Sequence, residues 1–261
     1  MPWGGQPTRL RDRVAIVTGA AGGLGSAISE RFAQEGALLC LVDSNSTAAT
    51  AATVRSHGAQ AVEVLADVIQ AAFVNAMVEQ ALTAFGRIDI LVNVAGASSH
   101  GPAATLPEAE WGRVLTHNLK SVFLCTQAVV APMRSRRYGR IIGIGSILGK
   151  NGGNPRPWID PGEQARAGNA AYGASKAGIH ALTFYFAKEL AADGITVNVV
   201  APGPIASPMT TNFPDTLRAL IPVGRMGTAT EVADAVTFLA GEAAAFVTGE
   251  VLDVNGGAWC D

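Results

Sequence analysis

The stretch RVAIVTGAAGGLGSAISERFAQEG, residues 13–36, links a short apolar run to an amphipathic segment through a glycine-rich turn. Its first part is rich in β-branched residues, which favours a buried strand, and its last part has the spacing of a helix. Gly19, Gly23 and Gly25 lack a Cβ atom, so the backbone can turn sharply there and approach a pyrophosphate, whose charge a helix N-terminus favours. Tight packing of a helix on a strand also needs glycine, so the turn alone leaves both interpretations open.

The same alternation of strand-like and helix-like segments continues along the chain. Short apolar runs lie at 13–19, 37–43, 60–67, 88–96, 139–146, 195–203 and 249–257. Ala-rich segments of helical length lie at 23–35, 70–85, 108–134, 172–192 and 229–240. Most of the apolar runs are apolar on both faces, as in a parallel sheet that is covered by helices on each side. We therefore predict an α/β fold: a doubly wound parallel sheet (Rossmann fold) of about seven strands with helices on both faces.

The composition is that of a globular protein with a sizeable core. The chain has 261 residues, of which 49% are hydrophobic and 15% charged, with a formal net charge of −2. This balance gives no electrostatic footprint for nucleic acid or an anionic membrane. No apolar run approaches the roughly 20 residues that cross a bilayer, and residues 1–13 lack the core of a signal peptide. We expect a single cytoplasmic domain over 1–261, with Cys40, Cys125 and Cys260 as reduced thiols and no metal site.

The end of the second apolar run points to a particular nucleotide. Asp43 lies there, 18 residues beyond Gly25. A carboxylate at this place can accept hydrogen bonds from the adenosine ribose hydroxyls, and it repels a 2′-phosphate. No Arg or Lys lies in 19–25 or just after Asp43. These observations favour NAD over NADP. An Asp that only caps a helix beginning near Ser46 is the alternative, and it explains less.

The stretch NAAYGASKAGIHALTF, residues 169–184, contains a phenol and an ammonium four positions apart, at Tyr172 and Lys176. On a helix these two side chains share a face. A phenol has a pKa of about 10, so it is a poor base at neutral pH unless nearby positive charge stabilises the phenolate. The ammonium and an oxidised nicotinamide ring would both do so. Tyr172 is therefore predicted to be a general base for alcohol oxidation or an acid for carbonyl reduction. A solvated pair on an exposed helix is the alternative.

Three motifs appear in one order: TGxxxGxG at 18–25, Asn-x-Ala-Gly at 93–96 and Tyr-x-x-x-Lys at 172–176. In these motifs the chain resembles the short-chain dehydrogenase/reductase family, from about residue 10 to residue 257. The resemblance implies that a set of residues binds the dinucleotide. They are Gly19, Gly22, Gly23, Leu24, Gly25, Asp43, Asp67, Val68, Asn93, Gly96, Tyr172, Lys176, Pro202, Gly203, Ile205 and Ser207.

Several of these residues acquire specific roles from the resemblance. Asp67 and Val68 match the pair that holds the adenine ring. Asn93 and Gly96 match the element that lines the adenine ribose and stabilises the centre of the sheet, although the family more often has a second Asn at the position of Val94. A further segment, PGPIASPM at 202–209, matches the one that holds the nicotinamide.

The resemblance also implies the rest of the cofactor and catalytic set. The backbone at Ile205 would hold the nicotinamide carboxamide, and Ser207 keeps a hydroxyl where the family commonly has Thr. Ser146 would hydrogen-bond the substrate oxygen and stabilise developing charge. Asn118 would kink its helix and hold a water that relays protons to Lys176. The catalytic residues are thus expected to be Asn118, Ser146, Tyr172 and Lys176, with Ser146 and Tyr172 also contacting the substrate.

One departure from the family pattern concerns the spacing before the catalytic helix. Ser146 and Tyr172 are 26 positions apart, about twice the separation usual in the family. The surplus residues, 149–169, contain three Pro and five Gly and have no sustained periodicity, so we predict a long loop beside the substrate cleft.

The loop has side chains that suit two kinds of contact. Trp158 and Ile159 could form an apolar wall, and Arg156 and Arg166 could pair with an anionic substrate group or remain solvated. A second wall is expected over 206–222.

Taken together, these features predict an NAD-dependent oxidoreductase that interconverts a secondary alcohol and a ketone. The nearest alternative is a 3-oxoacyl-[acyl-carrier-protein] reductase. Such reductases generally prefer NADP and often have a basic residue in the glycine-rich turn, whereas this chain has Asp43 and the neutral sequence AAGGLG. An alternative of another class is a non-catalytic nucleotide-binding scaffold, which should have lost one of the four catalytic residues. The segments 108–134 and 172–192 have more apolar surface than one sheet needs. Members of the family that the chain resembles commonly pair these two helices and form tetramers, so the resemblance implies a homotetramer, or failing that a dimer.

Overall fold

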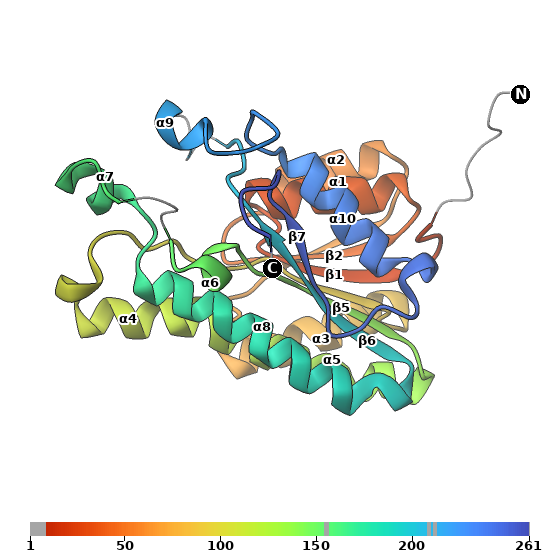
Figure 1. Ribbon diagram of the computed structural model, residues 1–261. Coiled ribbons are helices and arrows are strands. Elements are labelled where there is room, and N and C mark those ends of the chain that lie inside the picture. Colours follow the sequence, from red (N-terminus) through yellow and green to blue (C-terminus); the bar gives the residue numbers. More distant parts are fainter. Residues whose placement is uncertain (1–8, 154–156, 208–209, 211–212, 261) are drawn as a thin grey trace, which may run out of the picture.

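The computed structural model describes residues 9–153, 157–207, 210 and 213–260 (Figure 1). These residues form one parallel sheet of seven strands in the order β3-β2-β1-β4-β5-β6-β7. The strands are β1 (Val14–Thr18), β2 (Leu38–Asp43), β3 (Ala61–Leu65), β4 (Ile90–Asn93), β5 (Gly139–Ile144), β6 (Ile195–Pro202) and β7 (Val251–Val254). The four central strands are buried along their whole length because helices cover both faces. The predicted doubly wound sheet is confirmed.

The helices form two layers, one on each side of the sheet (Figure 1). On one side α1 packs against both α2 and α10, and on the other α3 packs against α5 while α8 packs against β6. Buried aliphatic side chains form a separate core cluster under each layer. The helices of these layers are α1 (Gly23–Gln34), α2 (Ala48–Ser56), α10 (Ala229–Ala240), α3 (Ala71–Phe85), α5 (Ser121–Arg136) and α8 (Ala170–Leu190).

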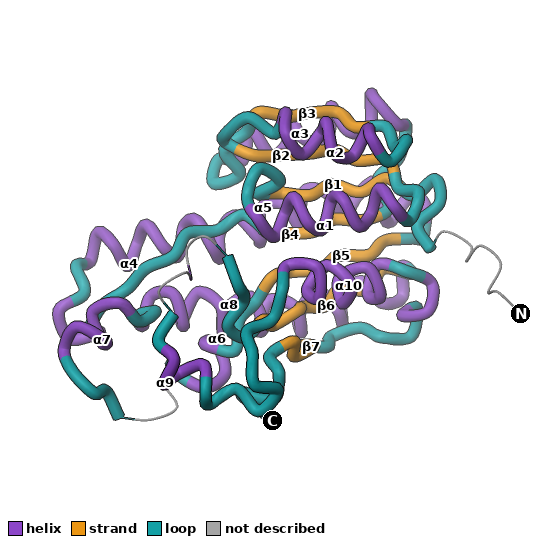
Figure 2. Tube along the Cα trace, turned by 90° about the horizontal axis from the view of Figure 1, so that it is seen from above, coloured by secondary structure: helices purple, strands orange, loops and turns teal. Residues whose placement is uncertain are grey.

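Shorter elements gather beyond the carboxyl ends of the strands, at the left of Figure 2. They include α4 (Glu108–Leu115), α6 (Leu148–Asn151), α7 (Pro161–Arg166) and α9 (Asp215–Arg218). Short 3₁₀ turns are η1 (Ala103–Thr105), η3 (Ala191–Asp193) and η5 (Glu242–Ala244). In doubly wound sheets ligands bind beyond this edge, near the point where the strand order reverses, which lies here between β1 and β4.

Two sequence predictions need correction. The helix predicted over 108–134 is interrupted, because a π-helical turn, η2 (Thr116–Lys120), separates α4 from α5. The segment 149–169, predicted to be a loop, contains most of α6 and all of α7. The second helix begins with Asp160, whose side chain accepts a hydrogen bond from the backbone N–H of Glu163, and with a proline in its first turn.

In the part of the chain that the structure describes, no helix has the length and apolarity needed to cross a membrane.

Candidate active site

The end of β5 and the first turns of α8 bring three predicted residues together. Ser146 follows β5, and its side chain lies near enough to the phenol of Tyr172 on α8 to lower the pKa of that phenol. Lys176, one turn further along the helix, has its ammonium nitrogen 5.6 Å from the centre of the Tyr172 ring. The shared helix face predicted from the spacing is present, and it faces the sheet rather than solvent, since Lys176 is only 6% exposed.

Burial sets the ionisation of both helix side chains. It raises the pKa of Tyr172, and the side chain of Ser146 opposes part of this rise. Burial lowers the pKa of Lys176 to about 8. The ammonium is anchored by a hydrogen bond that its nitrogen donates to the carbonyl oxygen of Ile144, over 2.7 Å. The lysine thus bonds directly to the end of β5 and acts on the phenol through space.

Asn118 lies in the π-helical turn η2, where it is buried. Its Oδ1 accepts a hydrogen bond from the backbone N–H of Ala97 over 2.6 Å, and its Nδ2 donates to the Ala97 carbonyl and to Ser175 Oγ, each over 3.0 Å. A Cβ atom on Gly96 would lie only 3.0 Å from Asn118 Oδ1, so the glycine permits this close approach. Asn118 therefore ties the loop after β4 to α8.

Two strands away from β5 along the carboxyl edge, after β1, the glycine-rich turn fits a pyrophosphate. Gly19 has a φ of +66°, and a Cβ on Gly25 would lie 2.1 Å from the Gly19 carbonyl oxygen, so both glycines are required by the turn itself. Gly22 is the N-cap of α1, and among the described residues no side chain caps this helix. A Cβ on Gly23 would have no atom within 4 Å. Leu24 is half-buried against the core. The N-terminus of α1 is thus open to an anion.

Two acidic side chains continue this edge. Asp43 accepts hydrogen bonds from the backbone N–H groups of Ala21 (3.0 Å) and Asn45 (2.9 Å), so its carboxylate is fixed between the glycine turn and the end of β2. Asp67, after β3, accepts a hydrogen bond from the backbone N–H of Ile69, and its neighbour Val68 is buried. Together with the open N-terminus of α1, these residues form one border that is suited to a dinucleotide.

The remaining predicted residues lie at the ends of β4 and β6. Asn93 is buried, and its amide donates a hydrogen bond to Thr126 of α5 over 3.3 Å, so its side chain braces the sheet. After Pro202, Gly203 donates its backbone N–H to Val254 over 3.0 Å. The structure places Ile205 beside Gly227 in an isolated bridge.

Ser207 is held in a small turn. Its backbone N–H donates to Thr210 Oγ1 over 2.8 Å, and that hydroxyl donates in turn to the carbonyl oxygen of Ile205 over 2.9 Å. Thr210 was not predicted as a site residue, although a hydroxyl three positions beyond Ser207 is a local signal for such a turn.

The described side chains of the inserted segment before α8 that were predicted to line the cleft are half-buried or exposed. Trp158 is half-buried, Ile159 is 64% exposed and Arg166 is exposed, whereas Arg156 lies outside the described residues. Two groups that sequence reasoning missed are Asn169, the N-cap of α8, and Ser99, which binds it. Asn just before a helix is a recognisable capping signal, but nothing in the sequence marks its partner 70 positions away. Within the described ranges, no group of three or more His, Cys, Asp or Glu side chains is placed to hold a metal ion.

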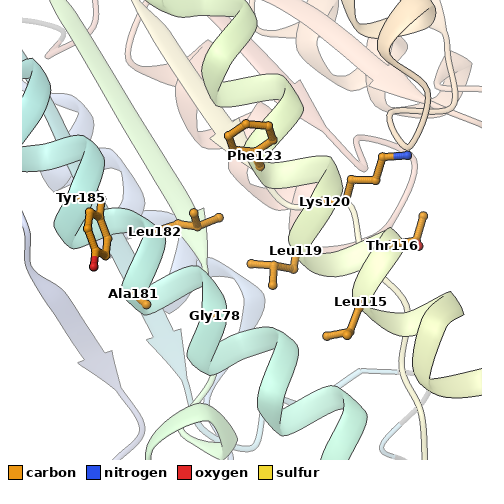
Figure 3. A pocket seen from close by; sticks show the side chains of 9 residues that line it. All are labelled: Leu115, Thr116, Leu119, Lys120, Phe123, Gly178, Ala181, Leu182 and Tyr185. Atoms are coloured by element: carbon orange, nitrogen blue, oxygen red, sulfur yellow. The ribbon is translucent and has the colours of Figure 1, made fainter. Parts of the chain in front are cut away.

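A separate apolar hollow of about 500 Å³ lies on another side of α8 (Figure 3). It is lined by Leu115, Leu119 and Phe123 from the α4–α5 run and by Leu182 and Tyr185 from α8. These positions form a different stripe of α8 from Tyr172 and Lys176, so the hollow does not belong to the candidate active site.

Comparison with known proteins shows what the whole chain is similar to. Residues 19–258 match the family model described as enoyl-(acyl carrier protein) reductase. The chain is 39% identical to the (2S)-[(R)-hydroxy(phenyl)methyl]succinyl-CoA dehydrogenase subunit BbsD of Thauera aromatica, over 95% of this chain and 97% of that protein. It is also 39% identical, with the same coverage, to the 3-oxoacyl-[acyl-carrier-protein] reductase FabG of Escherichia coli.

A solved structure extends the agreement to the whole fold. The chain superposes with a TM-score of 0.87 on a putative short-chain dehydrogenase/reductase from Burkholderia xenovorans, at 38% identity over 97% of this chain and 99% of the other. The motifs, the sheet and these relatives lead to one conclusion. The chain belongs to the short-chain dehydrogenase/reductase family of nicotinamide-dependent oxidoreductases.

Proposed function

We propose that the protein is an NAD-dependent oxidoreductase that interconverts a secondary alcohol and a ketone. The observation that carries this proposal is the arrangement of Ser146, Tyr172 and Lys176 at the carboxyl edge of the sheet. It provides two hydroxyl groups for one substrate oxygen, with a buried ammonium beside them. Such a set suits a reaction in which an oxygen atom gains or loses a proton while a hydride moves at the carbon next to it.

The protein's side chains supply the proton and hold the oxygen. In reduction, Tyr172 donates its hydroxyl proton to the carbonyl oxygen, and Ser146 donates a hydrogen bond to the same oxygen as its negative charge grows. In oxidation, the tyrosinate accepts the proton of the alcohol. When bound, the nicotinamide supplies or accepts the hydride at the substrate carbon. The oxygen thus exchanges one proton and the carbon one hydride in either direction.

Lys176 and Asn118 support the phenol in different ways. The ammonium of Lys176 stabilises the tyrosinate electrostatically, and its bond to Ile144 keeps it in place. It would also reach the ribose of the nicotinamide nucleotide. Asn118 holds the loop after β4 through both backbone groups of Ala97. The proton-relaying water expected at Asn118 stays a prediction.

The preference for NAD rests on Asp43. Its carboxylate is fixed by Ala21 and Asn45 at the end of β2, where a 2′-phosphate on the ribose would meet negative charge. In the same proposal, Asp67 and Val68 contact the adenine, and the segment containing Ile205 and Ser207 contacts the nicotinamide.

A 3-oxoacyl-[acyl-carrier-protein] reductase is the second candidate, and the 39% identity to FabG of Escherichia coli supports it. BbsD, at the same identity, is named as a dehydrogenase of a CoA thioester. The two candidates differ in cofactor and substrate. We would therefore measure turnover with NADH and NADPH, on a panel of cyclic and aryl ketones and on a 3-oxoacyl thioester. Our proposal requires NADH to be preferred, and a preference for NADPH with the thioester would favour the second candidate.

Tyr172→Phe separates an enzyme from a non-catalytic scaffold. The variant removes one hydroxyl from a half-buried ring, and we expect kcat to fall by about 10²-fold or more because general acid–base catalysis is lost. Binding of NADH, followed by its fluorescence, should change little. Unchanged turnover in this variant would contradict the proposed role of Tyr172.

We further propose that the protein assembles as a homotetramer, with a dimer as the alternative. The support is the apolar hollow between the α4–α5 run and α8, which is bordered by side chains as exposed as Tyr185, at 77% (Figure 3).

A further inference from the structure

The last residue of the inserted segment is tied to both sides of the cleft. Asn169 is 6% exposed, and its Oδ1 accepts a hydrogen bond from the backbone N–H of Tyr172 over 3.2 Å. Its Nδ2 donates to Ser99 Oγ over 2.7 Å and to the His100 carbonyl oxygen over 3.2 Å. The amide thus caps the catalytic helix with its oxygen and grips the loop after β4 with its nitrogen.

The hydrogen bonds of Asn169 continue through Ser99 to α4. Ser99 is buried, and its hydroxyl donates to Glu110 Oε1 over 2.5 Å. Glu110 accepts two further hydrogen bonds of 2.7 Å from Arg113, which also donates to the carbonyl oxygen of Ser98 over 3.0 Å. We call Asn169, Ser99, Glu110 and Arg113 the Asn169 network. Every link in it is a side-chain hydrogen bond, and two of its members are charged.

The backbone reinforces the same junction. Asn169 donates its N–H to the Ser99 carbonyl over 3.1 Å, Gly101 donates to Ala167 over 3.0 Å, and His100 pairs with Gly168 in an antiparallel bridge. Residues 97–101 are therefore held at one end by Asn118 and at the other by Asn169. The first turn of α8 is fixed between them.

We propose that Asn169 is a positioning residue, which sets the place of the Tyr172 phenol by fixing the first turn of α8 against residues 97–101. This inference rests on the proposed role of Tyr172. The N–H groups of a first helical turn have no partner within the helix, so loss of the cap allows the turn to fray. Tyr172 is the residue whose N–H is capped. A misplacement of a reacting group by about 1 Å can reduce a rate by about 10²-fold.

The test compares Asn169→Ala with Asn169→Asp, which keeps an acceptor for the Tyr172 N–H but can donate neither to Ser99 nor to His100. For Asn169→Ala we expect a kcat at least about tenfold lower and a KM for NAD within about twofold of that of the natural protein. The apparent pKa in the pH profile of kcat for alcohol oxidation should also shift. Asn169→Asp restores the cap but not the two bonds to residues 97–101, so it should recover only part of kcat. Leu239 lies on α10, in the core cluster on the other side of the sheet from α8, and is 1% exposed. Leu239→Ala is therefore the control for a loss of stability that does not move the first turn of α8.

The outcomes distinguish the two proposals. If Asn169→Ala lowers the Tm as Leu239→Ala does but leaves kcat and its pH profile unchanged, Asn169 is a structural cap only and the inference is wrong. If Tyr172→Phe remains active, the proposed function itself fails. Should Asn169→Ala not fold, Ser99→Ala carries the test, because it leaves the cap and removes one of the two bonds that the Asn169 amide donates to residues 97–101. A kcat reduced about threefold, with a shifted apparent pKa in its pH profile, would then support the inference. An unchanged kcat and an unchanged pH profile would overturn it.

Discussion

Lys176 holds an ammonium group in a buried position, where the charge opposes folding. The unfolded chain keeps this proton up to its ordinary pKa of 10.5, whereas the folded chain releases it near pH 8. Below pH 8 the folded state therefore carries a buried charge that the unfolded chain solvates better, and this penalty disappears as the pH rises from 8 to 10.5. The hydrogen bond to Ile144 offsets part of it.

We accordingly predict that Lys176→Met is inactive yet more stable at pH 7. After allowance for the lost hydrogen bond, the gain should be about 2 kcal/mol, or about 4 °C in Tm. The gain should shrink as the pH is raised from 8 to 10.5, which thermal unfolding at several pH values would reveal. Lys188→Met, on the exposed side of the same helix, is the matched control. A lower Tm for Lys176→Met at pH 7 would show that the ammonium stabilises the fold.

At the residue scale, the sequence predicts what is local and misses what is tertiary. Tyr172 and Lys176 could be paired from their spacing because four residues make about one helical turn. The Lys176 bond to Ile144 could not, since it depends on how α8 packs against the sheet. The same holds for Ser99, which meets Asn169 only through the fold.

Among the elements, the turn between β1 and α1 contains two glycines with different reasons to be glycine. Gly25 has no room for a side chain, because a Cβ would clash with the Gly19 carbonyl oxygen, whereas Gly23 faces open space. We predict that Gly25→Ala loses about 3 kcal/mol or more, since backbone must move. Gly23→Ala should fold with an unchanged or higher Tm, because Ala favours a helix over Gly by up to about 1 kcal/mol.

The paired variants should diverge in cofactor binding. For Gly23→Ala we expect the Kd of NADH to rise about tenfold, because the added methyl group occupies the space through which a pyrophosphate approaches the N-terminus of α1. Fluorescence titration and thermal unfolding of both variants provide the measurements. An unchanged Kd in Gly23→Ala would place the pyrophosphate elsewhere.

Elements that break a regular period are the ones that periodicity did not predict. The resemblance implied a kink at Asn118, but the apolar pattern of 108–134 favoured one helix and did not show that the break would be a π-helical turn over Thr116–Lys120. In the inserted segment, α7 has its own signal, an Asp-Pro pair followed by Glu163, but the abundance of Gly and Pro around it favoured a loop. Such short helices are held by caps and neighbours rather than by an apolar stripe.

For the whole molecule, periodicity was enough to predict the layers. Runs that are apolar on both faces must lie inside a parallel sheet, and amphipathic segments between them must cover it. The place of the candidate site could also be predicted, because the carboxyl ends of parallel strands lie along one edge of the sheet. How copies of the molecule would meet does not follow, because an exposed apolar stripe favours a contact without specifying its partner.

The hollow between α4–α5 and α8 allows the assembly to be tested. Tyr185 at its border is 77% exposed, so Tyr185→Glu should not disturb the chain's own core but would place a charge where a second copy is proposed to pack (Figure 3). We predict a tetramer for the natural protein and a dimer for this variant, measured by light scattering at micromolar concentration. Leu65→Glu, at a site 74% exposed on β3, should remain tetrameric. A tetramer in Tyr185→Glu, or a monomer in the natural protein, would rule out this face as the contact, since one buried unpaired charge costs about 3 kcal/mol or more in each copy.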